Sequence, residues 1–120
     1  MAIYERFAAW RRCHDLTLSV YRATESFPKS ELYGLTSQAR RAAISAGANL
    51  AEGSMKKGRN EFRRFLDISI GSLAELSYLL RCAKDLGFLP EQNWAELERC
   101  RDHAAAVTWK LYKSLGPRMG

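Results

Sequence analysis

Cysteine and histidine are scarce in this chain of 120 residues. The three cysteines, Cys13, Cys82 and Cys100, are an odd number without CxxC spacing, which argues against a disulfide framework and favours a reducing, cytoplasmic location. His103 follows Cys100 by three positions, but this pair would supply only half of a metal site. We therefore expect Cys100 to be a core cysteine and His103 a surface histidine, with no metal bound.

Long apolar runs are also missing. The longest nearly uncharged stretch, residues 68–80, is shorter than the roughly 18 apolar residues that a membrane-spanning helix needs. The first residues are charged where a signal peptide would be apolar. We expect neither a membrane span nor a secretion signal.

Motifs that mark catalytic and cofactor sites are absent. The sequence has no Walker loop, no GxGxxG, no GxSxG, no HExxH and no kinase motif. We therefore expect no cofactor and no enzymatic activity.

The apolar residues that are present recur at helical spacing, and no segment alternates with the period of a strand. Four helices are predicted, over residues 7–26, 36–53, 60–86 and from 90 to about 116. Short connections make sequential helices antiparallel neighbours. The predicted fold is an all-α, up-down-up-down antiparallel four-helix bundle that forms a single domain over residues 1–120. The start and stop signals are Thr36 or Ser37 and Asn60 as N-caps, Pro90 at the first helical position of the last helix, and Pro28, Gly53, Gly87 and Gly116-Pro117 at helix ends.

The second and third predicted helices have more apolar and small positions than one buried face needs. The second is rich in alanine and contains Gly47, and glycine inside a helix usually has a packing reason. The third carries a second stripe beside its core stripe: Ile68, Ser72, Glu75, Leu79, Cys82 and Leu86. Two stripes indicate two packing surfaces, and hence self-assembly. The predicted core includes Trp10, Leu50, Phe65, Leu73, Leu76 and Leu97.

Several segments together resemble one protein family. They are Trp10 and the VYRATESFP end of the first helix, YGLTSQARRAAIS, NLAEG at residues 49–53, NEFRRFLDISIGSLAEL at residues 60–76 and KDLGFL at residues 84–89. With these segments the chain resembles the four-helix-bundle proteins named for the intervening sequences of bacterial 23S ribosomal RNA genes. The family often carries Ile-Pro where this chain has Ala46-Gly47, so a proline kink does not carry over.

The resemblance implies a ring-like homo-oligomer, with a pentamer favoured, and no established enzymatic activity. A similar fold occurs in the accessory variability determinant of diversity-generating retroelements, a basic pentamer that works with a reverse transcriptase and nucleic acid. The resemblance therefore implies that the chain itself, nucleic acid and a protein partner are the binding candidates.

Positive charge is the main functional signal. Nineteen Lys and Arg against thirteen Asp and Glu give a net charge of +6, which favours anionic partners. Five bases fall within nine residues and are opposed only by Glu61: Lys56, Lys57, Arg59, Arg63 and Arg64. They predict a phosphate-binding patch whose affinity depends on salt. The alternative is a solvated turn. No nearby exposed aromatic residue interleaves these bases, although Trp109 and Tyr112 lie off the core stripe of the last helix and could make contacts.

A second group of polar residues lies on the two central helices. Asn49 and Glu52 share a helix face, and Glu75 lies in an apolar stripe. Two carboxylates could form an acid–base pair. The alternative is structural, in which the acids pair with Arg40 or Arg41 at an interface. No nucleophile, metal set or glycine loop accompanies them, so we expect the structural role.

The sequence therefore predicts a non-enzymatic, self-assembling scaffold that binds RNA or DNA through the basic patch. The alternative is a protein–protein scaffold without nucleic acid, which would use the second stripe of the third helix and the small residues of the second.

Overall fold

The computed structural model describes residues 1–116 of the chain. Its long helices are α1 (Ala8–Thr24), α2 (Leu35–Ser54), α3 (Arg59–Asp85) and α4 (Glu91–Ser114). Short 3-10 helices, η1 (Ile3–Arg6) and η2 (Lys29–Glu31), precede α1 and α2. The described residues contain no strand, so the predicted all-α class is confirmed, and each long helix begins and ends within two residues of its predicted bounds.

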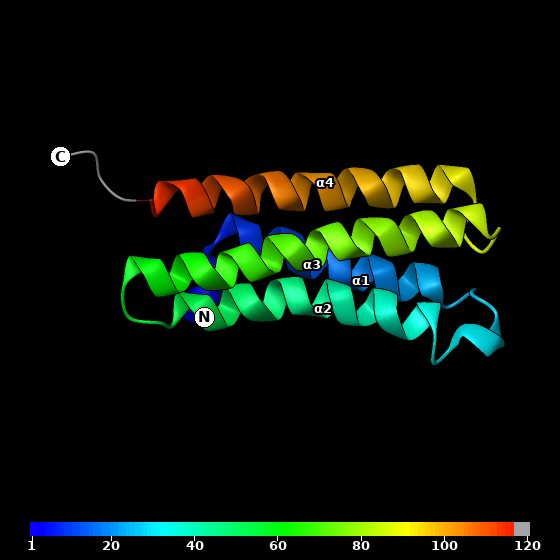
Figure 1. Ribbon diagram of the computed structural model, residues 1–120, viewed down its shortest axis with the longest axis horizontal. Helices are drawn as coiled ribbons and strands as arrows, with labels where there is room; N and C mark the ends of the chain where they lie inside the picture. The colour runs from blue at the N-terminus through cyan, green and yellow to red at the C-terminus, as the bar shows by residue number, and fades with distance from the viewer. Residues whose placement is uncertain (117–120) are drawn as a thin grey trace.

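The four helices form an elongated antiparallel bundle of 52 × 23 × 22 Å (Figure 1). Each helix contacts the next one along the chain, and α1 also contacts α4, which closes the bundle. The predicted up-down-up-down topology is confirmed. Within residues 1–116, no helix is both long and apolar enough to cross a membrane.

The predicted N-caps of α2 and α3 are wrong. The Leu35 amide at the start of α2 donates to the Glu31 carboxylate at 3.1 Å, because the 3-10 helix η2 brings Glu31 beneath the first turn. Helix α3 begins one residue before Asn60, after Gly58 with a φ of +91°, a value that favours glycine. Gly87, with a φ of +82°, follows the end of α3 as predicted. Of the predicted Gly116-Pro117 stop for α4, Pro117 lies outside the described residues.

Gly53 was predicted to end α2, and this is wrong. The residue lies buried inside the last turn of the helix. A Cβ atom on Gly53 would lie 2.7 Å from the Cβ of Phe65 and 3.1 Å from the Cδ1 of Phe62. The glycine is therefore required for the close approach of α2 and α3. Gly47 differs, since a Cβ there would lie 3.8 Å from both Cys13 and Trp10, an ordinary contact distance.

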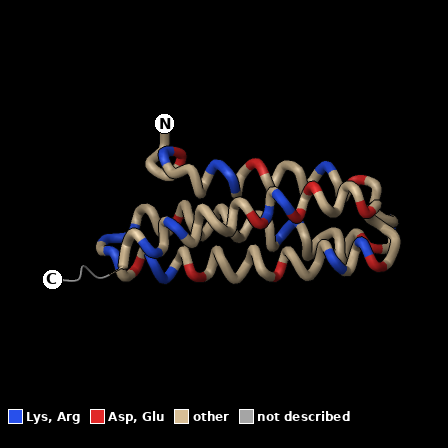
Figure 2. The backbone as a smooth tube through the Cα atoms, turned by 90° about the horizontal axis from the view of Figure 1, so that it is seen from above, with Lys and Arg blue, Asp and Glu red and all other residues tan. Residues whose placement is uncertain are grey.

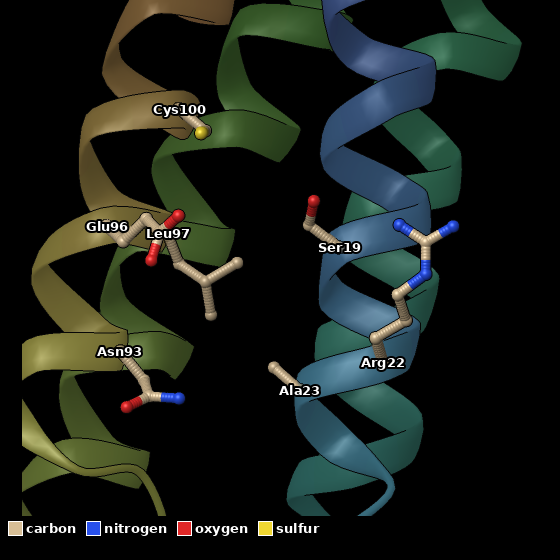
Figure 3. A pocket seen from close by; sticks show the side chains of 7 residues that line it. All are labelled: Ser19, Arg22, Ala23, Asn93, Glu96, Leu97 and Cys100. Atoms are coloured by element: carbon tan, nitrogen blue, oxygen red, sulfur yellow. The ribbon is translucent and has the colours of Figure 1, made fainter.

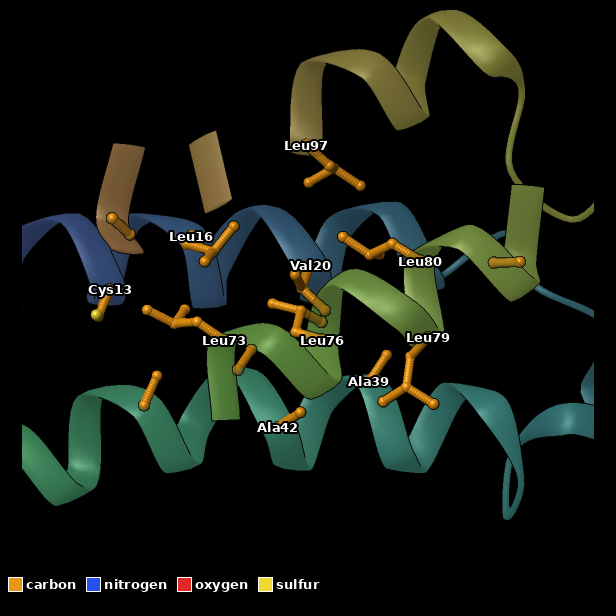
Figure 4. Close-up of a cluster of buried hydrophobic side chains, with 14 of the residues drawn as sticks. Cys13, Leu16, Val20, Ala39, Ala42, Leu73, Leu76, Leu79, Leu80 and Leu97 are labelled. Atoms are coloured by element: carbon orange, nitrogen blue, oxygen red, sulfur yellow. The ribbon is translucent and has the colours of Figure 1, made fainter. Parts of the chain in front are cut away.

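The core lies along the bundle axis and receives apolar side chains from all four helices (Figure 4). The predicted core residues Leu50, Phe65, Leu73, Leu76 and Leu97 are buried, as expected. Trp10 is only half-buried and stacks between Tyr4 and His14, with ring centroids 4.6 and 4.8 Å away.

The prediction that Cys100 is a core residue of α4 is wrong, because the buried side of α4 runs through Leu97, Ala104 and Thr108 and leaves Cys100 exposed. The Thr108 hydroxyl donates to the Ala104 carbonyl at 2.8 Å and lies 3.9 Å from the sulfur of Cys13. The hydroxyl thus satisfies its hydrogen bond within the helix while it is buried. Burial also raises the pKa of the Cys13 thiol to about 11, which keeps it protonated at neutral pH.

The second stripe of α3 is divided between core and surface. Leu79 is buried, whereas Ile68 is 41% exposed and Leu86 is 63% exposed. On α2, the neighbouring helix, Ile44 is 45% exposed. We call the surface around Ile44 and Ile68 the outer α2–α3 face.

Replacement of the two buried glycines of α2 by alanine should change the free energy of unfolding in opposite directions. Gly53→Ala should lower the free energy of unfolding by about 1–3 kcal/mol, since the added methyl overlaps Phe65. Gly47→Ala should raise it by about 0.5–1 kcal/mol, because alanine favours helix and the space is sufficient. Urea unfolding at one protein concentration measures both. A Gly53→Ala variant as stable as the parent would contradict the close-packing role.

Candidate nucleic-acid interface

The basic residues predicted from sequence lie on the turn between α2 and α3 and on the first two turns of α3. The Ser54 hydroxyl donates to the Ala51 carbonyl at 2.7 Å as α2 ends, and Gly58 reverses the chain before Arg59. Every residue from 55 to 61 is exposed. A turn of this kind presents its lysines to solvent at the end of the bundle.

Lys56 and Lys57 are the exposed lysines of this turn. The ammonium of Lys56 lies 5.3 Å from the centre of the Phe65 ring, which is a weak cation–π contact at an exposed site. Lys57 makes no hydrogen bond or ion pair with the described residues. Both ammonium groups are available to an external anion.

Arg64 has a partial internal partner. Its guanidinium pairs with the Glu61 carboxylate at 3.3 Å and lies 4.7 Å from the Phe65 ring centre. The Arg64 side chain is 59% exposed and the Glu61 side chain is 50% exposed, so the pair contributes little to stability. An approaching phosphate can therefore compete with Glu61 for Arg64.

Arg59 and Arg63, in contrast, join α3 to α4. The Arg59 guanidinium donates to the Ser114 carbonyl at 2.8 Å and to the Leu115 carbonyl at 3.4 Å. These carbonyls end α4, where the helix dipole is negative and favours a cation. The Arg63 guanidinium lies 4.3 Å from the centre of the Tyr112 ring. Its Nε is buried without a hydrogen-bond partner in the described part of the chain. Both arginines add positive charge here, but their geometry is determined by α4.

The end of α4 supplies further cations that sequence reasoning did not assign to the site. Lys110 and Lys113 are exposed, and Arg59 holds the end of their helix against the start of α3. Figure 2 shows the Lys and Arg positions gathered at this end of the bundle. We call residues 56–64 with 110–113 the basic end. It holds seven of the nineteen bases and one of the thirteen acids, so the rest of the chain carries twelve of each sign.

Two aromatic residues of α4, Trp109 and Tyr112, lie beside the bases of the turn. Trp109 and Tyr112 stack on each other with centroids 5.2 Å apart, between Arg63 on one ring and Lys113 on the other. Sequence distance hid this arrangement, since α4 lies about fifty residues from the turn. The only local signal was the spacing of the two aromatic and two basic residues on one helix.

The second predicted group of polar residues is not brought together. Arg40 points toward α1, where its Nε donates to Thr24 at 2.9 Å and its guanidinium lies over Tyr21. The Asn49 amide donates to the carbonyl and hydroxyl of Ser45 in the preceding turn, at 2.9 and 3.0 Å. Neither residue meets a carboxylate.

Arg41 and Glu75 do line one groove on the outer α2–α3 face, beside Ile44 and the hydrogen-bonded hydroxyls of Ser45 and Ser72. Glu52 lies elsewhere, in a shallow groove against the N-terminal residues. The two carboxylates therefore do not form an acid–base pair.

A groove of about 330 Å³ separates α1 from α4 near the opposite end (Figure 3). Leu97 and Ala23 line it, with Arg22 on one side and Asn93 and Glu96 on the other. Cys100 also lines it. Among residues 1–116, no three His, Cys, Asp or Glu side chains gather to hold a metal ion.

Comparisons with known proteins agree with this architecture. A family model described as "23S rRNA-intervening sequence protein" matches residues 5–109. No curated protein matches the chain. A crystal structure of a protein with unknown function from the S23 ribosomal protein family of Bacteroides thetaiotaomicron VPI-5482 has a TM-score of 0.79. It is 15% identical, and the alignment covers 88% of this chain and 99% of that chain. At this identity the likeness shows the fold alone.

Arg59 and Lys57 should differ in their contribution to stability. Arg59→Ala removes the charge-assisted bonds to the end of α4 and should lower the free energy of unfolding by about 1 kcal/mol. Lys57→Ala should change it by less than about 0.5 kcal/mol, because the side chain is exposed without a partner. The measurement is the urea midpoint at constant slope. Equal stability of the two variants would show that Arg59 does not anchor α4.

Proposed function

The chain belongs to the 23S rRNA-intervening sequence protein family, and from the charge and geometry of its basic end we propose that it is a non-catalytic scaffold that binds nucleic acid. The observation that carries this proposal is the concentration of charge. The seven bases and one acid of the basic end give a net charge of +6, which equals the net charge of the whole chain, and they lie at one end of a 52 Å bundle. Such a field attracts polyphosphate chains and raises their rate of association.

The seven bases of the basic end have different roles in this proposal. Lys56, Lys57, Lys110 and Lys113 make direct phosphate contacts, because their ammonium groups are exposed. Arg64 exchanges Glu61 for a phosphate. Arg59 and Arg63 hold the two helices in register and add to the field. The contacts are to phosphate, so this part of the interface binds RNA and DNA without sequence preference.

The same scaffold is proposed to work as a homo-oligomer in the cytoplasm. The outer α2–α3 face exposes Ile44 and Ile68 beside small residues, and apolar patches of this kind mark protein interfaces. A ring of copies, with a pentamer favoured by the family resemblance, would multiply the basic end. The repeated patch would strengthen binding to a long nucleic acid.

A protein–protein scaffold without nucleic acid is the second candidate. It is favoured by the same face, where Arg41 and Glu75 flank Ile44 without an ion pair between them. A protein partner that buries this face would satisfy both charges. Under this alternative the basic end would be ordinary solvated surface.

Charge reversal at the turn tests the nucleic-acid proposal. Binding of nuclease-treated protein to a labelled RNA and a DNA duplex is measured by fluorescence anisotropy across salt concentrations. The parent should show a log–log salt slope of several, and Lys56→Glu with Lys57→Glu should weaken affinity at least about tenfold and reduce the slope by about 2.

A matched control distinguishes the effect of where the charge is reversed from the effect of the change in net charge. Arg22→Glu with Lys29→Glu makes the same change in charge at exposed positions near the other end of the bundle. It should leave most of the affinity intact. The proposal is wrong if the parent does not bind at low salt, or if the two double variants lose affinity equally.

The outer α2–α3 face is tested by hydrodynamics. Ile44→Glu with Ile68→Glu should reduce the oligomeric state, because the carboxylates would be desolvated at the interface. Circular dichroism should show the same helix content as the parent. Sedimentation equilibrium measures the mass, with Leu32→Glu in the α1–α2 connection as the exposed control. A parent that sediments as a monomer, or an unchanged mass of the variant, would contradict assembly through this face.

A further inference from the structure

Two aromatic rings beside the basic end are stacked, and a cation lies over each of them. The rings of Trp109 and Tyr112 are nearly parallel, with an interplanar angle of 13° and centroids 5.2 Å apart. The Arg63 guanidinium lies 4.3 Å from the Tyr112 centroid, and the Lys113 ammonium lies 5.9 Å from the Trp109 centroid. The order is therefore cation, ring, ring, cation. We call these four residues the stacking ladder.

The inner half of the ladder is held firmly by the bundle. Tyr112 packs on the small core cluster that contains Leu50 and Leu66, and Arg63 is half-buried against it. The outer half is open, since Trp109 is 47% exposed. Lys113 lies near the limit of about 6 Å for a cation–π contact, so it is easily displaced from the indole. An exposed flat ring is thus preorganised at the surface.

A single exposed tryptophan is common and needs no functional explanation. This one differs because it adjoins the basic end, with Lys110 next to it in the chain and Arg59 donating to the carbonyl of Ser114. A flat ring among exposed cations suits a ligand with both phosphates and aromatic bases. Proteins that bind single strands combine these two features, because every base has a face that can stack.

We propose that Trp109, supported by Tyr112, stacks on an unpaired base, so that the nucleic acid bound at the basic end is single-stranded or carries unpaired bases. The inference rests on the proposed function and names its substrate class. A duplex satisfies only the phosphate contacts, since its base faces are covered by neighbouring pairs. RNA and DNA share the stacking chemistry, so each single strand should bind.

The experiment compares oligonucleotides of equal length, of which the three single strands carry equal numbers of phosphates. Labelled twelve-residue oligonucleotides are used as single-stranded DNA, single-stranded RNA, duplex DNA and a DNA strand with abasic sites in place of its central bases. Affinities are measured by anisotropy at one low salt concentration for the parent, Trp109→Ala and Trp109→Phe. Tyr33→Ala removes a 93% exposed aromatic residue from the connection between α1 and α2 and is the matched control.

The parent should bind both single strands more tightly than the abasic strand. Trp109→Ala should weaken single-strand binding about tenfold, the effect of losing one stacked base, and change duplex and abasic binding less than about twofold. Trp109→Phe should retain most of the affinity, and Tyr33→Ala all of it. Quenching of tryptophan fluorescence by single-stranded DNA should be present in the parent and largely absent in Trp109→Phe.

The outcomes separate the two proposals. If the parent binds every oligonucleotide and Trp109→Ala binds single strands equally well, the stacking inference is wrong while nucleic-acid binding stands. If the parent binds no oligonucleotide, both are wrong. If Trp109→Ala weakens the binding of all four ligands equally with its helix content unchanged, the residue does not stack on a base. It then contributes to the electrostatic field or to the local fold, and the inference is again overturned.

Discussion

Helices α2 and α3 can lie directly against each other because small side chains line the surfaces that meet. Gly53 leaves room for Phe65, whose Cβ would otherwise be 2.7 Å from a methyl group. Midway along the helices, the buried Ser69 hydroxyl donates to the Ala46 carbonyl at 2.8 Å. A contact this close aligns the end of α2 with the start of α3 and leaves only a short turn between them. The turn and its lysines therefore project from the end of the bundle.

The functional consequence is that local sequence and tertiary contact contribute different parts of one surface. The turn supplies free cations, whereas Arg59 and Arg63 are used to place the end of α4 beside the turn. That placement brings the stacked pair Trp109 and Tyr112 to the same end. Arginine is suited to both contacts, since its planar guanidinium can donate to several carbonyls and can lie flat on an aromatic ring. A surface that combines exposed cations with stacked aromatic rings then follows from ordinary helix packing.

The helices and the turn could be predicted from sequence because their signals are local. Apolar spacing, proline and glycine located each of the four long helices to within two residues, and five of six proposed core residues are buried. The misassigned residues depended on neighbours far along the chain. Gly53 looks like a helix stop until the aromatic residues of α3 are placed against it, and Cys100 looks like a core residue until the buried side of α4 is seen to run through Leu97, Ala104 and Thr108. In the candidate site, the contribution of α4 was missed for the same reason.

The most direct test of the basic end uses the six lysines of the chain, which lie at both ends of the bundle. The protein is acetylated with a limiting amine reagent, with and without a saturating single-stranded oligonucleotide, and each site is quantified by mass spectrometry. Nucleic acid at the basic end should protect Lys56, Lys57, Lys110 and Lys113, while Lys29 and Lys84 react as in the free protein. Equal protection of all six lysines, or protection of Lys29 and Lys84 alone, would contradict the account.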